Sequence, residues 1–195
     1  MKDEEILRIK EYAKEENIPI IQDEGIEFIT SFIDKKQIKK ILEIGTAIGY
    51  SAIMMALVSK DIHITTIERD ETRYMEALKN IKKMGLEDRI TLIFNDALNV
   101  EFNEKFDLIF IDAAKGKNID FFNRFEKNLE EDGYIITDNM SFHGYVEMNE
   151  EDIPSKNIRG IVRKIKDYIY FLENNMIYKT IIYQIGDGIA VTERR

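Results

Sequence analysis

Two helical patterns open the chain. From residue 3 to 16, apolar side chains recur at three- and four-residue intervals, and the pattern ends before Pro19, whose ring does not fit inside a helix. A second pattern begins at Asp23, a residue type that often caps helices, and runs to Lys35. We therefore predict two consecutive amphipathic helices within residues 1–37.

Short apolar runs then alternate with further helical patterns. The apolar runs lie at 41–44, 62–67, 90–94, 108–111 and 134–137. The helical patterns lie at 51–59, 70–85, 117–130 and 155–174. Alternating strands and helices are typical of a parallel sheet, because each helix carries the chain back to the start of the next strand.

The C-terminal segment breaks this alternation. The pattern predicts strands at 177–184 and 189–193, joined by the turn Gly186-Asp187-Gly188, which is typical of a β-hairpin. The chain contains no repeat, low-complexity segment or linker-like stretch. We therefore predict one α/β domain over residues 1–195, with a mostly parallel sheet, one antiparallel hairpin strand and helices on both faces.

Composition limits the chemistry that the chain can perform. The 195 residues carry a formal charge of −9 and include no cysteine, which excludes disulfides, thiolate nucleophiles and cysteine zinc sites. A metal would have to bind oxygen atoms or histidine. The longest apolar run, Ala52–Val58, is far shorter than the ~20 residues that cross a bilayer, so we expect a cytoplasmic protein without membrane contact. The acidic charge argues mildly against non-specific binding to nucleic acids.

The first candidate site lies after the first predicted strand, in the segment from Glu43 to Ser51. Gly45 and Gly49 would let a ligand approach the backbone at the start of a helix. Their spacing is G-x-x-x-G, and the G-x-G-x-x-G pattern that binds a pyrophosphate is missing. Glu43 would repel a diphosphate and attract an amino group. A tight strand-to-helix turn without a ligand is an equally good interpretation of this segment alone.

Two more acids follow the next two strands. Glu68 ends the second predicted strand and Asp96 follows the third. Each acid alone is most simply interpreted as a solvated loop residue. Together with Glu43 they place three carboxylates at one edge of the sheet, where ligands of open α/β folds bind. The set favours a nucleoside with a positive group and no phosphates, which describes S-adenosylmethionine (SAM) better than NAD.

A second group of polar residues follows strands four and five. Asp112 ends one strand, and Asp138 and Asn139 end the other. Carboxylate and amide oxygens are the ligands that Mg²⁺ or Ca²⁺ prefers. Asp and Asn are also common turn residues, which would explain them without a metal. We favour the metal site, because an Asp at the end of each of two neighbouring strands has no evident structural purpose.

Lys115 and the two histidines are the remaining candidates. Lys115 lies three residues after Asp112, where it could act as a general base beside a bound cation, although most such lysines are solvated surface residues. His63 falls within the second strand, and we expect it to be structural. His143 follows Asn139 by four residues and could line the mouth of a substrate site.

Five segments carry a resemblance to a known family. In this order, EIGTAIGYSA, IERDE, IFIDAAKG, ITDNM and IGDGIAV resemble the catechol O-methyltransferase-like family of metal-dependent class I methyltransferases. The likeness extends from about Ile18 to the end of the chain, and is greatest to the bacterial tRNA 5-hydroxyuridine methyltransferases. It implies a seven-stranded Rossmann-like sheet with one reversed strand, SAM as methyl donor, Mg²⁺ and a homodimer. It also implies that residues 1–37 contribute to a lid over cofactor and substrate.

The resemblance also implies roles for individual residues. The metal ligands of the family fall on Asp112, Asp138 and Asn139, and the lysine assigned as base falls on Lys115, with Asp112 beside it in the catalytic set. The cofactor contacts of the family fall on Ile21, Glu43, Gly45, Ser51, Glu68, Asp96, Ala97 and Asp112. His143 stands where relatives often have lysine, which affects substrate access.

The acceptor remains open between two classes. A metal that chelates two adjacent oxygens suits both 5-hydroxyuridine at the tRNA wobble position, which would become 5-methoxyuridine, and a catechol or caffeoyl-CoA-like small molecule. For RNA, a basic stripe of Arg159, Arg163 and Lys166 is the candidate contact, although an ordinary solvated helix face would have the same pattern. Two rival functions are an NAD-dependent oxidoreductase and a non-catalytic scaffold.

Overall fold

The computed structural model describes residues 2–195. Met1, the first residue of the predicted N-terminal segment 1–37, lies outside the described residues. Helix α1 spans Lys2–Glu15 and α2 spans Asp23–Lys36, which confirms the two predicted helices. The predicted cap of α2 is wrong: Gln22 occupies the cap position, and Asp23 is the first residue of the helix. After α1, Asn17 adopts a φ of +53°, and the Ile18 amide donates to the Ala13 carbonyl at 2.8 Å. This closes the helix in the manner of a left-handed C-terminal cap before Pro19.

The remaining elements follow the predicted alternation. The strands are β1 Lys40–Ile44, β2 His63–Glu68, β3 Ile90–Phe94, β4 Phe106–Ile111, β5 Leu129–Thr137, β6 Tyr178–Tyr183 and β7 Ile189–Arg194. The helices are α3 Tyr50–Val58, α4 Glu71–Lys83, α5 Asn118–Phe125 and α6 Lys156–Glu173. Short 3₁₀ turns lie at η1 Ala97–Asn99, η2 Lys115–Lys117, η3 Glu126–Asn128 and η4 Glu150–Asp152.

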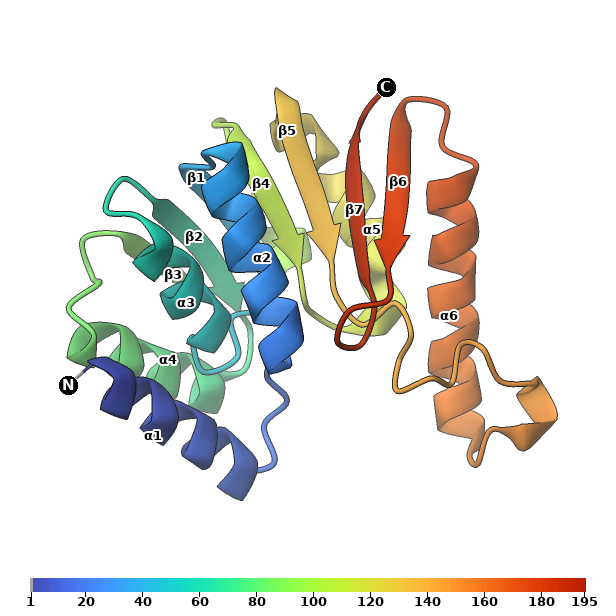
Figure 1. Ribbon diagram of the computed structural model, residues 1–195, viewed down its shortest axis with the longest axis horizontal. Coiled ribbons are helices and arrows are strands. Elements are labelled where there is room, and N and C mark those ends of the chain that lie inside the picture. The colour runs from blue at the N-terminus through green and yellow to red at the C-terminus, as the bar shows by residue number, and fades with distance from the viewer. Residues whose placement is uncertain (1) are drawn as a thin grey trace.

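All seven strands form one sheet, in the order β3-β2-β1-β4-β5-β7-β6 (Figure 1). The first five pair in parallel, while β7 runs antiparallel to both β5 and β6. The predicted parallel sheet with one reversed hairpin strand is therefore confirmed. Figure 1 shows α1 below the edge at which the parallel strands end.

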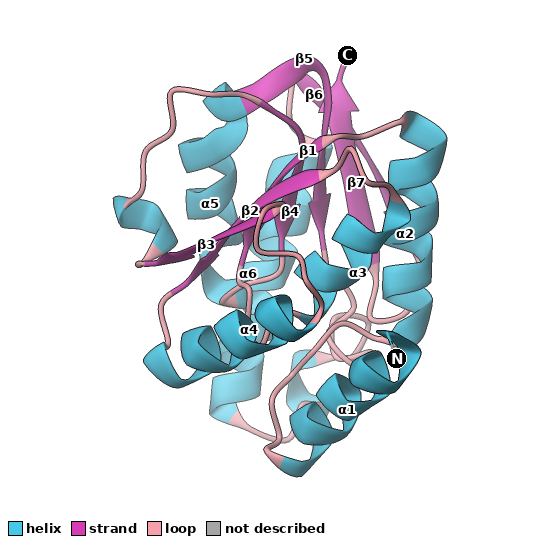
Figure 2. Cartoon of the chain, turned by 90° about the vertical axis from the view of Figure 1, so that its left-hand side faces the viewer, coloured by secondary structure: helices cyan, strands magenta, loops and turns pink. Residues whose placement is uncertain are grey.

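Two hydrophobic layers cover the sheet, because alternate side chains of a strand point to opposite faces. In β1, Ile41 packs with α1, α2 and α3, whereas Leu42 packs with α5 and α6 on the other face. Figure 2 shows this arrangement, with α2 and α3 on one side of the sheet and α5 on the other. Both Ile41 and Leu42 are fully buried, as expected for a sheet covered on both faces.

One predicted boundary is wrong. The helical pattern of residues 117–130 ends at Phe125, and β5 begins at Leu129 instead of residue 134. Leu129 is fully buried and pairs with Phe106, whereas the polar residues 130–132 are exposed and the pairing shifts register there. The exposed polar segment interrupts the apolar run, which is why the pattern concealed the start of this strand.

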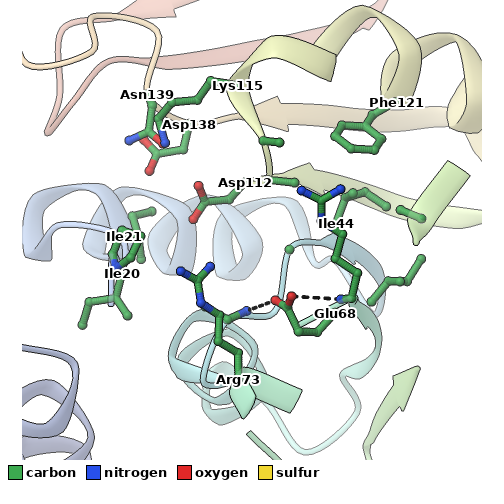
Figure 3. Close-up of a pocket in the computed structure, with 18 of the residues that line it drawn as sticks. Ile20, Ile21, Ile44, Glu68, Arg73, Asp112, Lys115, Phe121, Asp138 and Asn139 are labelled. Atoms are coloured by element: carbon green, nitrogen blue, oxygen red, sulfur yellow. Dashed lines mark hydrogen bonds between the residues drawn. The ribbon is translucent and has the colours of Figure 1, made fainter. Parts of the chain in front are cut away.

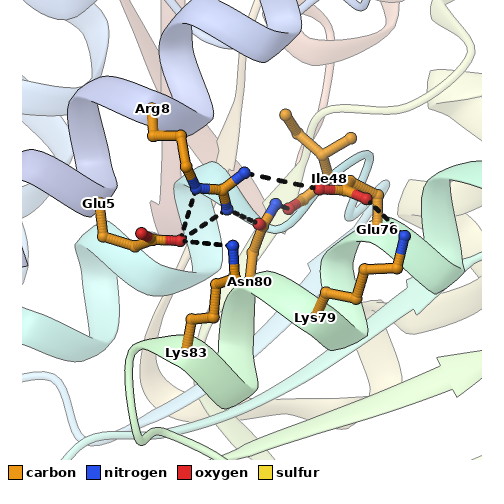
Figure 4. A network of polar contacts seen from close by, with 7 residues as sticks. All are labelled: Glu5, Arg8, Ile48, Glu76, Lys79, Asn80 and Lys83. Atoms are coloured by element: carbon orange, nitrogen blue, oxygen red, sulfur yellow. Dashed lines mark hydrogen bonds and ion pairs between the residues drawn. The ribbon is translucent and has the colours of Figure 1, made fainter.

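A polar network fixes α1 against the rest of the molecule (Figure 4). Arg8 of α1 pairs with Glu5 at 2.6 Å and donates to the Asn80 side chain of α4 at 2.6 Å. Asn80 is fully buried and donates in turn to the carbonyl of Ile48 at 2.9 Å. Because Ile48 belongs to the loop after β1, this network connects the N-terminal helix to that loop. Within residues 2–195, no helix is long and apolar enough to cross a membrane.

Candidate functional site

A cavity of about 520 Å³ opens where the parallel strands end (Figure 3). Its walls come from the loops that follow β1 to β5, from the α1–α2 linker and from Ile161 of α6. Backbone hydrogen bonds continue past the strands and fix these loops. The Asp112 amide donates to the Ile44 carbonyl at 3.0 Å, and the Asp138 amide donates to the Ile111 carbonyl at 3.2 Å.

Most residues predicted for the site line this one cavity. They are Ile21, Gly45, Glu68, Asp96, Ala97, Asp112, Lys115, Asp138, Asn139 and His143. Only the linker of the predicted lid segment, residues 19–22, reaches the cavity wall. His63 lies at the start of β2 with an exposed side chain and does not line it.

Glu68 is held in a fixed position at the cavity wall. One carboxylate oxygen accepts the amide of Ala47 at 2.8 Å, and the other accepts the amides of Arg69 at 2.9 Å and Asp70 at 2.8 Å. Figure 3 shows this carboxylate facing the cavity. A carboxylate with fixed orientation and remaining lone pairs can accept two hydroxyls from one ligand, as the ribose of a nucleoside offers.

Asp96 is a second fixed carboxylate on the same side. It caps η1 by accepting the Leu98 amide at 3.0 Å, and its other oxygen lies 3.4 Å from Arg69. The hydrogen bond from Leu98, followed by the nearby charges of Lys117 and Arg69, holds the pKa of Asp96 below its usual value. Asp96 therefore remains ionised at neutral pH.

Glu43 and Ser51 lie behind the cavity wall rather than on it. Both were predicted to contact the cofactor, yet neither is among the lining residues. Glu43 shares the face of β1 that α3 covers, and its fully buried carboxylate accepts the hydroxyls of Ser51 and Thr66, each at 2.5 Å. Burial raises the pKa of Glu43 to about 7, against the lowering effect of these hydrogen bonds. The structure thus assigns both side chains to a polar cluster that supports the loop between β1 and α3.

The predicted metal residues come together at the other end of the cavity. Figure 3 shows Asp112, Asp138, Asn139 and Lys115 next to one another. Burial, and then the charge of Asp112, raises the pKa of Asp138 to about 7. Burial also raises the pKa of Asp112, and Lys115 opposes that rise. The buried Asp138 and the half-buried Asp112, with a neutral amide beside them, are a donor set that fits a hard divalent cation.

This donor set contains only two acids. Within residues 2–195, no three His, Cys, Asp or Glu side chains form a group that could hold a metal ion. The third donor here is the amide of Asn139, whose φ of +65° aims the residue out of the strand direction. Its oxygen could serve a cation as a third donor without adding a further charge to the two acids.

Two functional candidates were not predicted from the sequence. Arg73 lines the cavity, and Figure 3 shows its guanidinium pointing inward; among residues 2–195 no hydrogen bond or ion pair engages this side chain. Its place in the first turn of α4, shortly past the end of β2, is the signal that could have revealed it. Asp187 lies only 3.1 Å from the Asn139 amide nitrogen, and no local pattern connects the two.

Comparison with known proteins agrees with this arrangement. Residues 3–195 match the O-methyltransferase family. The chain belongs to that family. It is a SAM-dependent O-methyltransferase, and its sheet is that of the class I methyltransferases.

Individual relatives of this O-methyltransferase cover nearly the whole chain. A caffeoyl-CoA O-methyltransferase from Populus kitakamiensis is 27% identical over 193 residues, which are 95% of this chain and 82% of the relative. A crystal structure from Staphylococcus aureus, provisionally described as a caffeoyl-CoA O-methyltransferase, is 37% identical to this chain. The two superpose with a TM-score of 0.92, over 97% of this chain and 92% of the Staphylococcus aureus chain. A Bacillus cereus O-methyltransferase, solved in complex with SAH, is 25% identical, with a TM-score of 0.82 over 100% of this chain and 90% of that one.

Proposed function

We propose that this O-methyltransferase is Mg²⁺-dependent and methylates a hydroxyl that has a second oxygen next to it. The observation that carries the proposal is the meeting of Asp112, Asp138 and Asn139 beside Lys115 at one end of the cavity. These three residues would hold the cation, which would polarise both acceptor oxygens and favour loss of the hydroxyl proton.

The chain's own residues account for the rest of the reaction. Glu68 and Asp96 bind the adenosine part of SAM, and the backbone at Gly45 lies against its amino-acid part. Lys115 takes the acceptor proton, and its side-chain nitrogen lies 5.9 Å from the centre of the Phe142 ring. The acceptor oxygen forms a bond to the methyl carbon while the carbon–sulfur bond breaks, so that SAM becomes SAH.

For the acceptor, we propose 5-hydroxyuridine in the wobble position of tRNA. The support is the sequence likeness to that group of enzymes and the cations at the cavity rim. Lys115 and Lys117 flank Gly116, and the ammonium of Lys164 lies 3.1 Å from the position of a Cβ on Gly116. An acidic protein therefore presents Lys164 and Lys117 near the catalytic Lys115, where these two cations can contact the phosphates that flank a bound nucleotide.

We expect the basic stripe on α6 to contribute less to RNA binding than its sequence pattern suggests, because two of its three members have partners within the protein. Arg163 forms an ion pair with Glu150, and Arg159 donates to the Ile153 carbonyl at 3.3 Å. Both side chains therefore hold the 150–153 segment in place. Lys164, on the same helix, is the residue that faces the cavity rim. We infer that RNA contact centres on Lys164 and Lys117.

A small-molecule acceptor is the second candidate. One support is the similarity to a caffeoyl-CoA O-methyltransferase. The other is the cavity, which is large enough to hold SAM together with a phenolic ring. The deciding experiment incubates the protein with SAM and Mg²⁺, in parallel on 5-hydroxyuridine-containing tRNA, on a catechol and on caffeoyl-CoA, followed by mass spectrometry. Formation of 5-methoxyuridine supports the tRNA assignment. Turnover of a phenol without 5-methoxyuridine would replace it.

We also propose that the protein is a homodimer. Exposed apolar side chains gather at the outer edge of the sheet, where Met176, Ile177 and Ile181 are 87%, 59% and 55% exposed. Strand β6 forms this edge, and an apolar edge strand is normally covered in the native state. Sedimentation at several concentrations tests the proposal, and a monomer at all of them would contradict it.

A further inference from the structure

The turn between β6 and β7 packs directly on the loop that carries the metal residues. The amide of Met140 donates to the Gly188 carbonyl at 2.9 Å, and the amide of Ser141 donates to the Asp187 carbonyl at 2.8 Å. A Cβ on Gly188 would lie 2.7 Å from the Ser141 nitrogen. The two backbones therefore touch, and Asp187 is carried to the metal loop by this contact.

Asp187 is almost completely buried, at 5% exposure, and both oxygens of its carboxylate accept hydrogen bonds. One oxygen accepts the side-chain amide of Asn139 at 3.1 Å. The other oxygen accepts the backbone amide of His143 in a short hydrogen bond and lies 3.8 Å from the ring nitrogen Nδ1 of the same residue. Asp187 thus spans the loop from its first residue to its fifth.

The contact with Asn139 determines which end of the amide faces the cavity. The nitrogen and oxygen of an amide lie on opposite sides of its carbon, so a nitrogen held by Asp187 leaves the oxygen free on the other side. Without that partner, the side chain could turn over and present an N–H donor to a cation, which cannot bind it. The backbone also needs support, because Asn139, Phe142 and His143 all adopt positive φ angles, of +65°, +47° and +57°.

We propose that Asp187 is a positioning residue for metal binding, which fixes the carbonyl oxygen of Asn139 toward the cation and maintains the 139–143 loop. The inference rests on the metal site of the proposed function. Partners that orient metal ligands typically contribute about 10- to 100-fold to metal affinity.

The test measures Mn²⁺ affinity by electron paramagnetic resonance on the full-length protein, without acceptor or turnover. We expect Asp187→Asn to weaken Mn²⁺ binding at least 10-fold. The new side chain has only one acceptor oxygen, so its NH₂ group would face one of the two N–H donors that Asp187 now accepts, those of Asn139 and His143. Asn139→Asp should also weaken binding, although it adds a negative charge, because two carboxylates then face each other at 187 and 139. The exchange variant Asn139→Asp/Asp187→Asn again pairs one amide donor with one carboxylate acceptor between positions 139 and 187. Its Mn²⁺ affinity should return to within about threefold of that of the unchanged protein.

Glu147→Gln is the matched control. Glu147 lies just after the 139–143 loop and accepts the Ser141 hydroxyl at 3.0 Å, so this variant removes a negative charge next to the loop without touching Asn139. It should leave Mn²⁺ affinity unchanged. SAM affinity, measured for every variant, reports whether the fold is intact.

The outcomes separate the two proposals. If the unchanged protein does not bind Mn²⁺, the metal site of the proposed function is wrong. If it does bind, and Asp187→Asn binds equally well, only the role of Asp187 is wrong. The positioning role is refuted if Asn139→Asp tightens Mn²⁺ binding and the change in binding free energy of the exchange variant equals the sum of the changes in the two single variants. Charge alone would then account for the effect.

Discussion

Gly45 and Asp112 touch through their backbones. A Cβ on residue 45 would lie 2.2 Å from the carbonyl oxygen of Asp112, and the φ of +99° at Gly45 lies in the region that favours glycine. The contact brings the loop after β1 against the loop after β4. The contact thereby holds the cavity wall at Gly45 against the wall that carries Asp112.

The first prediction concerns this contact. Gly45→Ala should reduce SAM affinity at least 10-fold and destabilise the fold by about 2–4 kcal/mol, since both the strained φ and the clash act together. Calorimetric titration with SAM and urea unfolding measure the two effects. Gly160→Ala is the control: Gly160 lies on the exposed face of α6 with open space around it, and the change should be neutral or stabilise by up to ~1 kcal/mol. Near-normal SAM binding by Gly45→Ala would contradict the prediction.

The second prediction follows from the raised pKa of Glu43. A folded-state pKa of about 7, against an ordinary value of 4.5, means that the folded protein holds a proton that the unfolded chain releases. Stability contributed by this group is therefore complete below pH 4.5 and is lost as the pH rises through 7. Glu43→Gln, which stays neutral, should match the unchanged protein near pH 5 and exceed its stability by up to ~3 kcal/mol at pH 8.

Urea unfolding of both proteins at several pH values measures this difference. The hydroxyls of Ser51 and Thr66 can rotate to suit a glutamine, so the packing of the cluster should be preserved. A stability difference that does not change between pH 5 and pH 8 would show that Glu43 is ionised throughout.

The third prediction concerns Lys115. Lys115→Met should lower the methyl-transfer rate in a single turnover by ~10²- to 10⁴-fold, the range for loss of a general base. SAM affinity should be unchanged, because Lys115 lies beside Asp138 and Asn139, at the opposite end of the cavity from Glu68 (Figure 3). Lys105→Met is the control, since Lys105 lies exposed at the opposite end of β4. A rate near that of the unchanged protein would remove Lys115 from the catalytic set.

The fourth prediction tests the network between α1 and the loop after β1. Asn80→Ala should destabilise the protein by roughly 2–4 kcal/mol, because it leaves the Ile48 carbonyl and the Arg8 guanidinium without their buried partner. SAM affinity should fall with it, since Ile48 belongs to the loop after β1, whose residues Gly45 and Ala47 line the cavity. Lys79→Ala removes an exposed lysine whose ion pair with the buried Glu76 faces solvent on the lysine side only, and it should change stability by less than about 1 kcal/mol. Equal effects of the two changes would show that the network does not support the loop.

The fifth prediction separates the cations of α6 by reversing charges. Lys164→Glu should weaken tRNA methylation at least 10-fold and reduce its salt dependence, because Lys164 faces the cavity rim. Arg163→Glu should have a smaller effect, since Arg163 is already paired with Glu150. SAM affinity should be the same in both variants. A larger effect of Arg163→Glu would return the RNA contact to the basic stripe.

Local patterns along the chain determined most of the fold and the position of the site. The alternation of apolar runs and helices predicted the parallel sheet, and parallel strands bring their ends to one edge regardless of side-chain detail. Strand-terminal residues such as Glu68, Asp112 and Asp138 could therefore be placed together from their positions in the chain. The Gly186-Asp187-Gly188 turn predicted the reversed strand for the same reason, because turn chemistry is local.

The tertiary structure decided what each of these side chains contacts. Glu43 ends in a hydroxyl cluster under α3 because strand alternation turns it to the face that α3 covers, and only packing shows which face that is. Asn139 and Asp187 are 48 residues apart and meet because β7 inserts between β5 and β6. Spacing in the sequence carries no information about such a contact, since it depends on strand order, and strand order is set by the packing of the whole sheet.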